Sequence, residues 1–172
     1  EALIDALVAV TGVATVVKNA SGRARGNEGL DNQGGVVRGT LDGPVPVQMN
    51  GATYMADLIG GQKTGLFYDQ RDNHAFAARL ARAARVLDMF AHVGGCGLAA
   101  LAAGATSALA VDGSADALAL AEAGAVAMGV SEKFTTKQSD AFDAMAELSS
   151  ENSRFDLVVC DPPAFAPQKP AL

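Results

Sequence analysis

The sequence predicts an α/β protein, with a doubly wound parallel sheet preceded by a small, β-rich α+β domain. Two observations predict this fold class. From residue 61 onward, short apolar segments alternate with longer segments of helical character, as in sheets whose parallel strands are joined by crossover helices. Before residue 61, β-branched segments are instead separated by turn-rich stretches. We therefore expect a small domain over residues 1–60 and a larger domain over residues 61–172.

Each element of the larger domain follows from its apolar pattern. Strands are expected at residues 86–90, 108–111, 134–137 and 155–160. Helices are expected at residues 72–85, 97–103, 115–128 and 141–148. Ser114 is suited to cap the third of these helices, and Asp116 favours its positive N-terminus. Because doubly wound sheets usually have five or more strands, we expect the C-terminal strands of the domain to be missing from this chain.

The smaller domain is predicted from its β-branched segments and turns. These segments lie at residues 12–17, 35–40, 45–49 and 52–58. The Asp-Gly-Pro sequence at residues 42–44 is typical of a turn between two of them. Residues 2–10 have the character of the end of a helix.

Composition excludes several classes of protein. The chain has 172 residues, of which 49% are hydrophobic and 19% charged, so it is an ordinary globular sequence. No apolar run reaches the roughly 18 residues that a membrane-spanning helix needs, and the first ten residues lack the features of a secretory signal. Two cysteines are too few for a disulfide framework or a Cys-rich metal site. We expect a cytoplasmic protein without a metal centre, and the sequence does not predict its oligomeric state.

Charge is distributed unevenly along the chain, whose net charge is −6. Residues 1–85 contain nine Lys and Arg against eight Asp and Glu, whereas residues 86–172 contain four against eleven. The acidic second half argues against a protein that wraps nucleic acid with its whole surface. Arg79, Arg82 and Arg85 are spaced to form a basic strip on one helix, which would contact RNA or else simply face solvent.

Residues that follow the predicted strands indicate a nucleoside cofactor. In open parallel sheets, ligands bind at the carboxyl ends of the strands. The first strand is followed by Gly94, Gly95 and Gly97, which would let the backbone approach a ligand at the start of a helix. The second strand ends at Asp112, whose carboxylate could accept both hydroxyls of a ribose.

Two features favour S-adenosylmethionine over NAD as this cofactor. Asp88, within the first strand, is placed to receive the ammonium group of a methionine moiety. Asp161-Pro162-Pro163, at the end of the fourth strand, would hold a carboxylate and carbonyls rigidly toward a planar base. Asp140 would contact the adenine amine, or else cap a helix. The segment 95–100 also fits a loose G-x-G-x-x-A dinucleotide pattern, so an NAD-dependent oxidoreductase remains an alternative.

These motifs resemble those of a known family. The segments 61–73 (Gly-Gln-Lys-Thr-Gly-Leu-Phe-Tyr-Asp-Gln-Arg-Asp-Asn), 86–97 and 161–165, together with Asp112, are similar to the class I S-adenosylmethionine-dependent rRNA methyltransferases that join a PUA domain to a Rossmann-like domain. The resemblance is to the large-subunit rRNA cytosine-5 type and covers nearly the whole chain. It implies a Rossmann-like fold, S-adenosylmethionine as cofactor, and methylation of carbon 5 of a cytosine in large-subunit rRNA.

The resemblance also implies a set of site residues. The family's Gly-x-Phe-x-Asp-Gln-Arg element lines the cofactor site, which adds Phe67, Asp69, Gln70 and Arg71. The full cofactor-binding set is then Phe67, Asp69, Gln70, Arg71, Asp88, Gly94, Gly95, Gly97, Asp112, Gly113 and Asp140. The catalytic set is Asp161, Pro162, Pro163 and Phe165.

One difference from a related group of methyltransferases narrows the kind of atom that we expect to be methylated. Methyltransferases that act on amines place an aromatic residue directly after the second proline, where this chain has Ala164. This difference favours methylation of a ring carbon or ring nitrogen. In the resembling family the nucleophilic cysteine lies on a later strand, so we expect this chain to lack it. Methylation of a guanine ring nitrogen and a non-catalytic cofactor-binding module remain alternatives.

The remaining cysteines and histidines receive plainer interpretations. Cys160 is expected to be a small buried hydrophobic residue, and Cys96 is expected to pack within the cofactor loop. His92 is expected to pack in the loop or to lie beside the cofactor, and His74 to be an ordinary helix residue.

Overall fold

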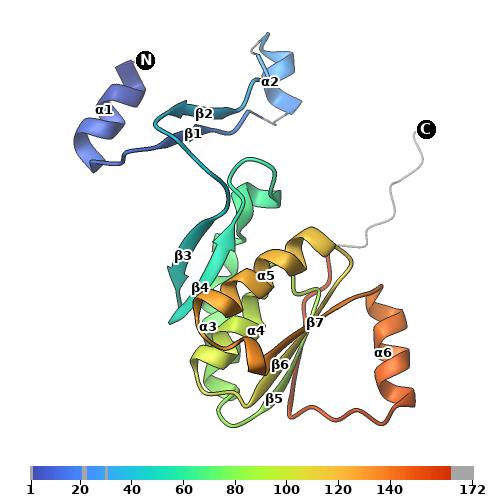
Figure 1. Cartoon of the computed structure of the whole chain (residues 1–172). Coiled ribbons are helices and arrows are strands. Elements are labelled where there is room, and N and C mark those ends of the chain that lie inside the picture. Colours follow the sequence, from blue (N-terminus) through green and yellow to red (C-terminus); the bar gives the residue numbers. More distant parts are fainter. Residues whose placement is uncertain (1, 21–22, 30, 164–172) are drawn as a thin grey trace, which may run out of the picture. The chain divides into compact units, whose positions relative to one another are not determined.

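The computed structural model describes residues 2–20, 23–29 and 31–163, and it divides into two compact units (Figure 1). Unit 1 comprises residues 1–45 and 56–66, and unit 2 comprises residues 46–55 and 67–172. This division differs from the predicted single boundary at residue 60, because the segment 46–55 belongs to unit 2. None of the helices in the described part of the chain combines the length and apolar character that a membrane crossing requires.

Unit 1 is built from short elements. It contains the helices α1 (Ala2–Thr11) and α2 (Arg23–Asn27), the 3-10 helix η1 (Gln62–Gly65), and the antiparallel strands β1 (Val16–Lys18) and β2 (Gly35–Arg38). Gly12 adopts a positive φ of 69° after α1, and its N–H donates to the carbonyl of Val8. This is the left-handed conformation in which helices often end. The predicted helix and strands are present, although the strands are shorter than expected.

A β-hairpin opens unit 2, apart from its end residues Val45 and Ala56, which belong to unit 1. It consists of β3 (Val45–Met49) and β4 (Ala52–Ala56), joined by Asn50 and Gly51. Both joining residues have positive φ, of 55° and 77°, as a tight Asn-Gly hairpin turn requires. Tyr54 of β4 is fully buried, and its role in the site is described below.

The main sheet of unit 2 has four parallel strands in the order β7-β6-β5-β8. The strands are β5 (Arg85–Met89), β6 (Ser107–Asp112), β7 (Phe134–Gln138) and β8 (Leu157–Cys160). The chain builds the sheet outward from β5 to β6 and β7, and then places β8 on the other side of β5. This reversal confirms the predicted doubly wound parallel sheet and creates a switch point between β5 and β8.

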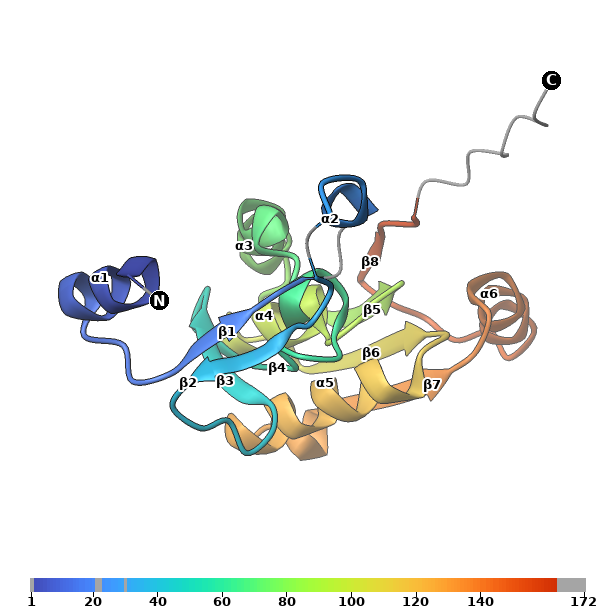
Figure 2. The ribbon, with the colours of Figure 1, turned by 90° about the horizontal axis from the view of Figure 1, so that it is seen from above.

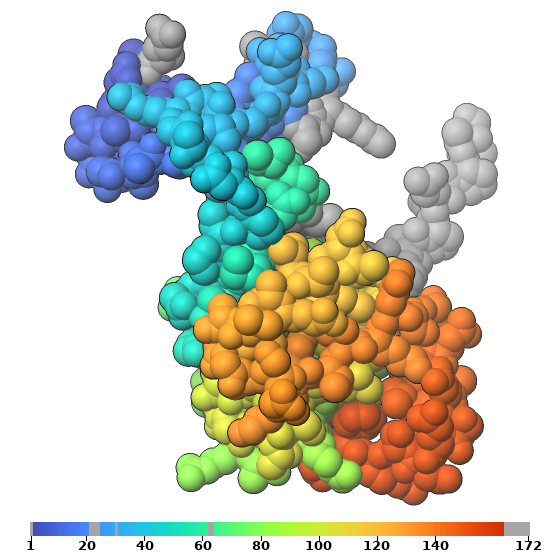
Figure 3. All heavy atoms as spheres, in the orientation of Figure 1, coloured from blue at the N-terminus to red at the C-terminus, as the bar shows by residue number. Residues whose placement is uncertain are grey.

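Helices cover both faces of this sheet (Figures 1 and 2). The helices of unit 2 are α3 (Arg71–Leu80), α4 (Gly95–Ala102), α5 (Ala115–Ala127) and α6 (Ala141–Ser150), with the 3-10 helices η2 (Tyr68–Gln70) and η3 (Ser131–Lys133). Of these, α3 packs against α4. Helices α4 and α5 pack on one face, and α6 packs on the other, where Leu87, Met89 and Val111 meet Ala141 and Ala144. In Figure 3, gold α5 and orange-red α6 lie on different sides of the visible surface.

The predicted helix over residues 72–85 is too long at its C-terminal end. Helix α3 ends at Leu80, and Ala83 has a positive φ of 59°. The N–H of Ala83 donates to the carbonyl of Gly104, 2.9 Å away, rather than continuing the helix. Apolar periodicity alone could not predict where α3 ends. Alanine normally favours a helix, but Ala83 adopts a left-handed conformation here.

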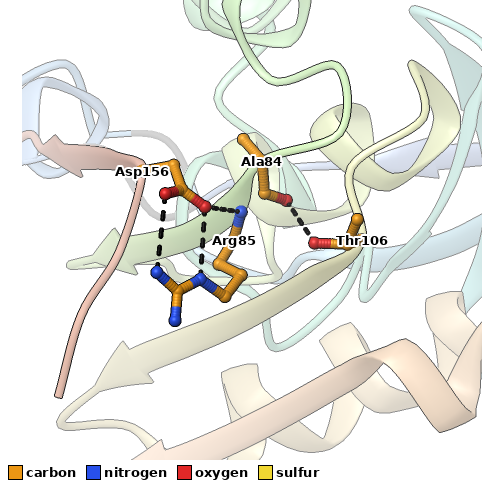
Figure 4. Close-up of polar contacts among 4 residues, drawn as sticks. All are labelled: Ala84, Arg85, Thr106 and Asp156. Carbon is orange, nitrogen blue, oxygen red and sulfur yellow. Dashed lines mark hydrogen bonds and ion pairs between the residues drawn. The ribbon is translucent and has the colours of Figure 1, made fainter.

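Arg85 begins β5 instead of ending the helix (Figure 4). Its backbone N–H and its guanidinium Nε donate to the Asp156 carboxylate, at 2.8 and 3.2 Å. The carbonyl of neighbouring Ala84 accepts the hydroxyl of Thr106 at 3.0 Å. The prediction that Arg79, Arg82 and Arg85 share one helix is therefore wrong.

Candidate cofactor and substrate site

The site lies where the order of the sheet reverses. The carboxyl ends of β5 and β8 are adjacent there, and a cavity of about 420 Å³ opens among β5, β8, α3 and the start of α4. Polar lining residues include Gln70, Asn73, His74, Asp88 and Asp161. The rest of the wall is largely apolar, as in many small-molecule sites.

Asp88 is buried at the centre of this arrangement. Its Oδ2 accepts the backbone N–H groups of Cys96 and Gly97, at 3.1 and 2.7 Å, in the first turn of α4. Burial raises the pKa of Asp88 to about 7, although these two hydrogen bonds lower the pKa and so oppose the rise. The charges of Asp112 and Asp161 raise it further. A cationic group bound beside Asp88 would therefore find a carboxyl group that ionises near neutral pH.

The loop between β5 and α4 carries three left-handed residues. Phe90 and His92 have φ of 59° and 50°, and Gly94, which precedes α4, has φ of 79°. Left-handed backbone at non-glycine residues is uncommon and clusters at functional sites.

The predicted glycines of this loop are packed against protein side chains. A Cβ on Gly94 would lie 3.1 Å from the Cβ of Ala121. A Cβ on Gly97 would lie 3.2 Å from the Phe134 ring. These glycines allow α4 to approach its neighbours closely, and a direct cofactor contact by either one stays a prediction.

Two residues that the sequence analysis did not select fix Gly95. The Tyr54 hydroxyl donates to the Gly95 carbonyl at 3.0 Å in a buried hydrogen bond. The His74 ring lies so close that a Cβ on Gly95 would be 2.5 Å from its Cε1 and 2.6 Å from its Nε2. Tyr54 comes from the hairpin and His74 from α3, and nothing in the pattern of either segment indicates this meeting. His74 lies in helix α3, as expected, and it also lines the cavity.

Asp112 ends β6 and is half-buried. Its Oδ2 accepts the N–H of His92 at 2.8 Å, and its Oδ1 accepts the N–H of Ser114 at 2.9 Å. Each carboxylate oxygen has a second lone pair, so further hydroxyl groups can still be accepted. Gly113 has open space beside its Cα, and the Phe67 ring packs edge-on against His92 with centroids 5.1 Å apart.

A chain of hydrogen bonds joins the segment before α3 to the residue that follows β8. Asn73 Nδ2 donates to Gln70 Oε1 at 2.6 Å, and Gln70 Nε2 donates to Asp161 Oδ2 at 2.9 Å. The structure thus brings together Gln70 and Asp161, which are 91 positions apart in the sequence. Asn73 is a further residue that the sequence analysis did not select.

Other predicted residues of these two motifs lie at or near the surface. The side chains of Asp69, Arg71, Pro162 and Pro163 are exposed. The Arg71 carbonyl accepts the Asn50 side chain at 2.8 Å. Phe165 lies outside the described residues.

Asp140 and the cysteines complete the comparison with the sequence. Asp140 is exposed and caps α6, where its Oδ1 accepts the N–H groups of Phe142 and Asp143. Contact with adenine stays a prediction. Cys96 is buried, and burial raises the pKa of its thiol. Cys160 is exposed, contrary to expectation, because alternate side chains of β8 face outward.

Comparison with known protein families identifies the group to which this sequence is related. A family model described as "Conserved hypothetical protein 95" matches residues 72–169, more than half of the chain. The chain belongs to this family. The match to the conserved hypothetical protein 95 family includes His74, Asp88, Asp112 and Asp161, and it begins after Gln70 and Tyr54.

Curated relatives extend the similarity beyond that family match. A ribosomal RNA large subunit methyltransferase I from Tolumonas auensis is 35% identical over 99% of this chain and 44% of its own length. A protein of the same name from Alteromonas mediterranea is 39% identical over 86% of this chain and 38% of its own length. The chain thus spans less than half the length of these relatives.

Solved structures show the same fold. A crystal structure described as that of a methyltransferase complexed with SAH has a TM-score of 0.70 and 26% identity. The similarity covers 80% of this chain and 37% of that protein. For this member of the conserved hypothetical protein 95 family, the predicted Rossmann-like fold is confirmed.

Proposed function

We propose that this chain is the S-adenosylmethionine-binding part of a methyltransferase that modifies a base of large-subunit rRNA. The observation that carries the proposal is the meeting of Asp88, Gln70 and Asp161 around one cavity at the switch point of the sheet. The names of the two curated relatives and the SAH-bound similar structure support it. A cytoplasmic location belongs to the same proposal.

The residues present fit this cofactor. Asp88 would hold the ammonium group of its amino-acid end, because a buried carboxyl group with a pKa raised to about 7 gains from a neighbouring cation. Asp112 would hold the ribose hydroxyls with its remaining lone pairs. When bound, S-adenosylmethionine supplies an activated methyl group. The protein's own task is to position the base beside it.

Asp161 and the two prolines would position that base. Gln70 holds one Asp161 oxygen by a hydrogen bond, which leaves the other oxygen to face a substrate. Pro162 and Pro163 fix the backbone that follows Asp161, because proline restricts φ. The finer assignment, carbon 5 of cytosine with Phe165 in the same segment, is part of the proposal and rests on the family resemblance.

RNA contact by Arg79, Arg82 and Arg85 is also proposed, and the three are not equivalent. Arg79 lies over the ring of Phe76, 5.4 Å from its centroid, and Phe76 lines the cavity. Arg85 lies at the amino-terminal edge of the sheet and is paired with Asp156, away from the carboxyl edge where the site lies. Arg79 is therefore the best placed of the three.

Calorimetric titration with S-adenosylhomocysteine tests the proposal, with NAD as the comparison ligand. We expect S-adenosylhomocysteine to bind and NAD not to bind. Asp112→Asn should weaken binding about tenfold, since it removes charge-assisted hydrogen bonds to the ribose. Asp116 is an exposed carboxylate in the first turn of α5. The Asp116→Asn variant is therefore the matched control and should bind S-adenosylhomocysteine normally. A cooperatively folded protein that does not bind S-adenosylhomocysteine would refute the proposal.

A further inference from the structure

Asn73 is a polar residue at the cavity to which the proposed function assigns no role. It lies in the first turn of α3, and it lines the cavity together with Gln70 and Asp161. Its Nδ2 donates to Gln70 Oε1 at 2.6 Å, and Gln70 Nε2 donates to Asp161 Oδ2 at 2.9 Å. Asn73 therefore reaches Asp161 through the side-chain amide of Gln70.

The charge of Asp161 sets the direction of this chain of hydrogen bonds. An ionised carboxylate only accepts hydrogen bonds, so the Gln70 side chain turns its NH2 group toward Asp161. The carbonyl oxygen of Gln70 then lies at the other end of the amide and needs a donor. Asn73 supplies that donor with its own NH2 group. An aspartate at position 73 would instead bring a second acceptor.

Gln70 occupies the N-cap position of α3 without capping this helix. Side chains at such a position commonly accept a helix N–H group, but within the described residues the Gln70 side chain makes no bond of this kind. It bridges instead to a residue 91 positions later in the sequence. The half-buried Gln70 amide is thus held between two side chains, one on α3 and one that follows β8.

The Asp161 side chain gains from being held in this way. It is exposed after the end of β8, and an exposed side chain keeps its rotamer freedom unless contacts fix it. Burial raises the pKa of Asp88 and lowers that of His74, and the charge of Asp161 acts on both groups. The Asp161 carboxylate therefore lies near these cavity residues, where alignment of a reacting base requires a fixed orientation.

We propose that Asn73 is a positioning residue for the Asp161 carboxylate and acts by fixing the orientation of the Gln70 amide. This inference rests on the proposed function, in which Asp161 positions the base that is methylated. Without Asn73, the Gln70 amide is free to rotate, and Asp161 loses a fixed donor although Gln70 and Asp161 are both unchanged.

NMR of the Gln70 side-chain amide tests this orientation. In the native protein, the Nε2 proton that points to Asp161 should resonate downfield of the value for a free glutamine side chain. Asn73→Ala should move this resonance toward the free value. Asp72→Asn, an exposed change in the same turn of α3, is the control and should leave it in place. An unchanged resonance in folded Asn73→Ala would overturn the inference.

Reversing the chain of hydrogen bonds gives a second test. Asn73→Asp places acceptors at both ends of the Gln70 amide and should raise the unfolding equilibrium constant in urea about fivefold. Adding Asp161→Asn supplies a donor at the far end, so the amide can turn around and donate to the new carboxylate. This double variant should unfold within about twofold of Asp161→Asn alone, a comparison that cancels the effect of Asp161→Asn itself.

A second double variant separates this reversal from a change in charge. Asn73→Asp combined with Asp72→Asn has the net charge of the native protein, as the first double variant does, but it leaves Asp161 as an acceptor. It should stay about fivefold less stable than Asp72→Asn alone. Equal recovery in the two double variants would show that charge alone matters and would overturn the inference.

The proposed function is tested separately, by binding of S-adenosylhomocysteine to the native protein. Absence of binding would refute the proposed function even if Asn73 and Asp161 are coupled through Gln70. Binding by a protein whose Gln70 resonance ignores Asn73→Ala would uphold the proposed function and overturn only the role of Asn73. The two failures are therefore distinguishable.

Discussion

Replacing Asp88 with asparagine should change how the stability of the protein depends on pH. In the unfolded chain, Asp88 ionises near its usual pKa of 3.8, whereas burial raises the pKa in the folded protein to about 7. Between these values the folded state binds more protons than the unfolded state, so the free energy of unfolding falls as pH rises. Asparagine keeps an oxygen that can accept the N–H groups of Cys96 and Gly97 but has no proton to lose in this range.

The two pKa values set the size of the effect. Integrating the difference in bound protons from pH 5 to pH 8 gives a loss of about 2.5 kcal/mol in the native protein from this one group. Asp88 is almost fully buried, so solvent screening does not reduce the figure substantially. The Asp88→Asn variant should lack this loss. It should therefore gain about 2.5 kcal/mol relative to the native protein between pH 5 and pH 8.

Urea unfolding at pH 5 and pH 8 measures this difference directly. Asp116→Asn, at an exposed position, should follow the native protein at both pH values. The same variants titrated with S-adenosylhomocysteine should show that Asp88→Asn binds more weakly, although its stability changes less between pH 5 and pH 8. If Asp88→Asn and the native protein lose stability in parallel between pH 5 and pH 8, Asp88 does not hold its proton in the folded state and the reasoning is refuted.

Three further changes test how unit 2 is held together. Gly95→Ala should destabilise the protein by about 1–3 kcal/mol in urea unfolding, because its Cβ would meet His74, whereas Gly113→Ala has open space and should unfold at nearly the native urea concentration. Tyr54→Phe removes the buried hydrogen bond to the Gly95 carbonyl and should cost about 1–3 kcal/mol; an unchanged midpoint would mean that this bond contributes nothing. Asp156→Asn should lower the melting temperature at pH 7, because hydrogen bonds and charge from Arg85 lower the pKa of Asp156. That stabilisation is present above pH 3.8 and is lost as the pH falls through the lowered value, so a deficit that persists unchanged at pH 2 would contradict it.

The sequence predicted the parallel sheet because its strands are apolar and its crossover helices are amphipathic or small-residue segments. It also placed Asp112 and Asp161 at strand ends, since the position of a residue in a parallel strand decides the edge at which it lies. The end of α3 was predicted wrongly, because Ala83 is an ordinary helix residue by propensity. Only its bond to Gly104 in the neighbouring segment shows why the chain turns there.

The sequence pattern could not predict the residues that support the site. Tyr54 and His74 act on Gly95 from a hairpin and a helix that no periodicity relates to the glycine loop. Asn73 was overlooked for a similar reason, since its role depends on Gln70 pointing toward Asp161. Such contacts depend on how elements pack, and residue type alone does not encode that packing.

The glycine loop, residues 90–97, is held in place mainly by hydrogen bonds and contacts with other residues of the protein. The conformational freedom of its own glycines contributes less. Its N–H groups from Gly94 to Gly97 are all bonded within the protein, and Gly95 is fixed by Tyr54 and His74. A loop without free N–H groups cannot select a ligand by itself, because recognition of charge needs donors and acceptors that face the cavity. Selection must therefore come from side chains on β5, α3 and the segment after β8. This is why changes at Asp88 should alter cofactor binding, while changes at Tyr54 should chiefly alter stability.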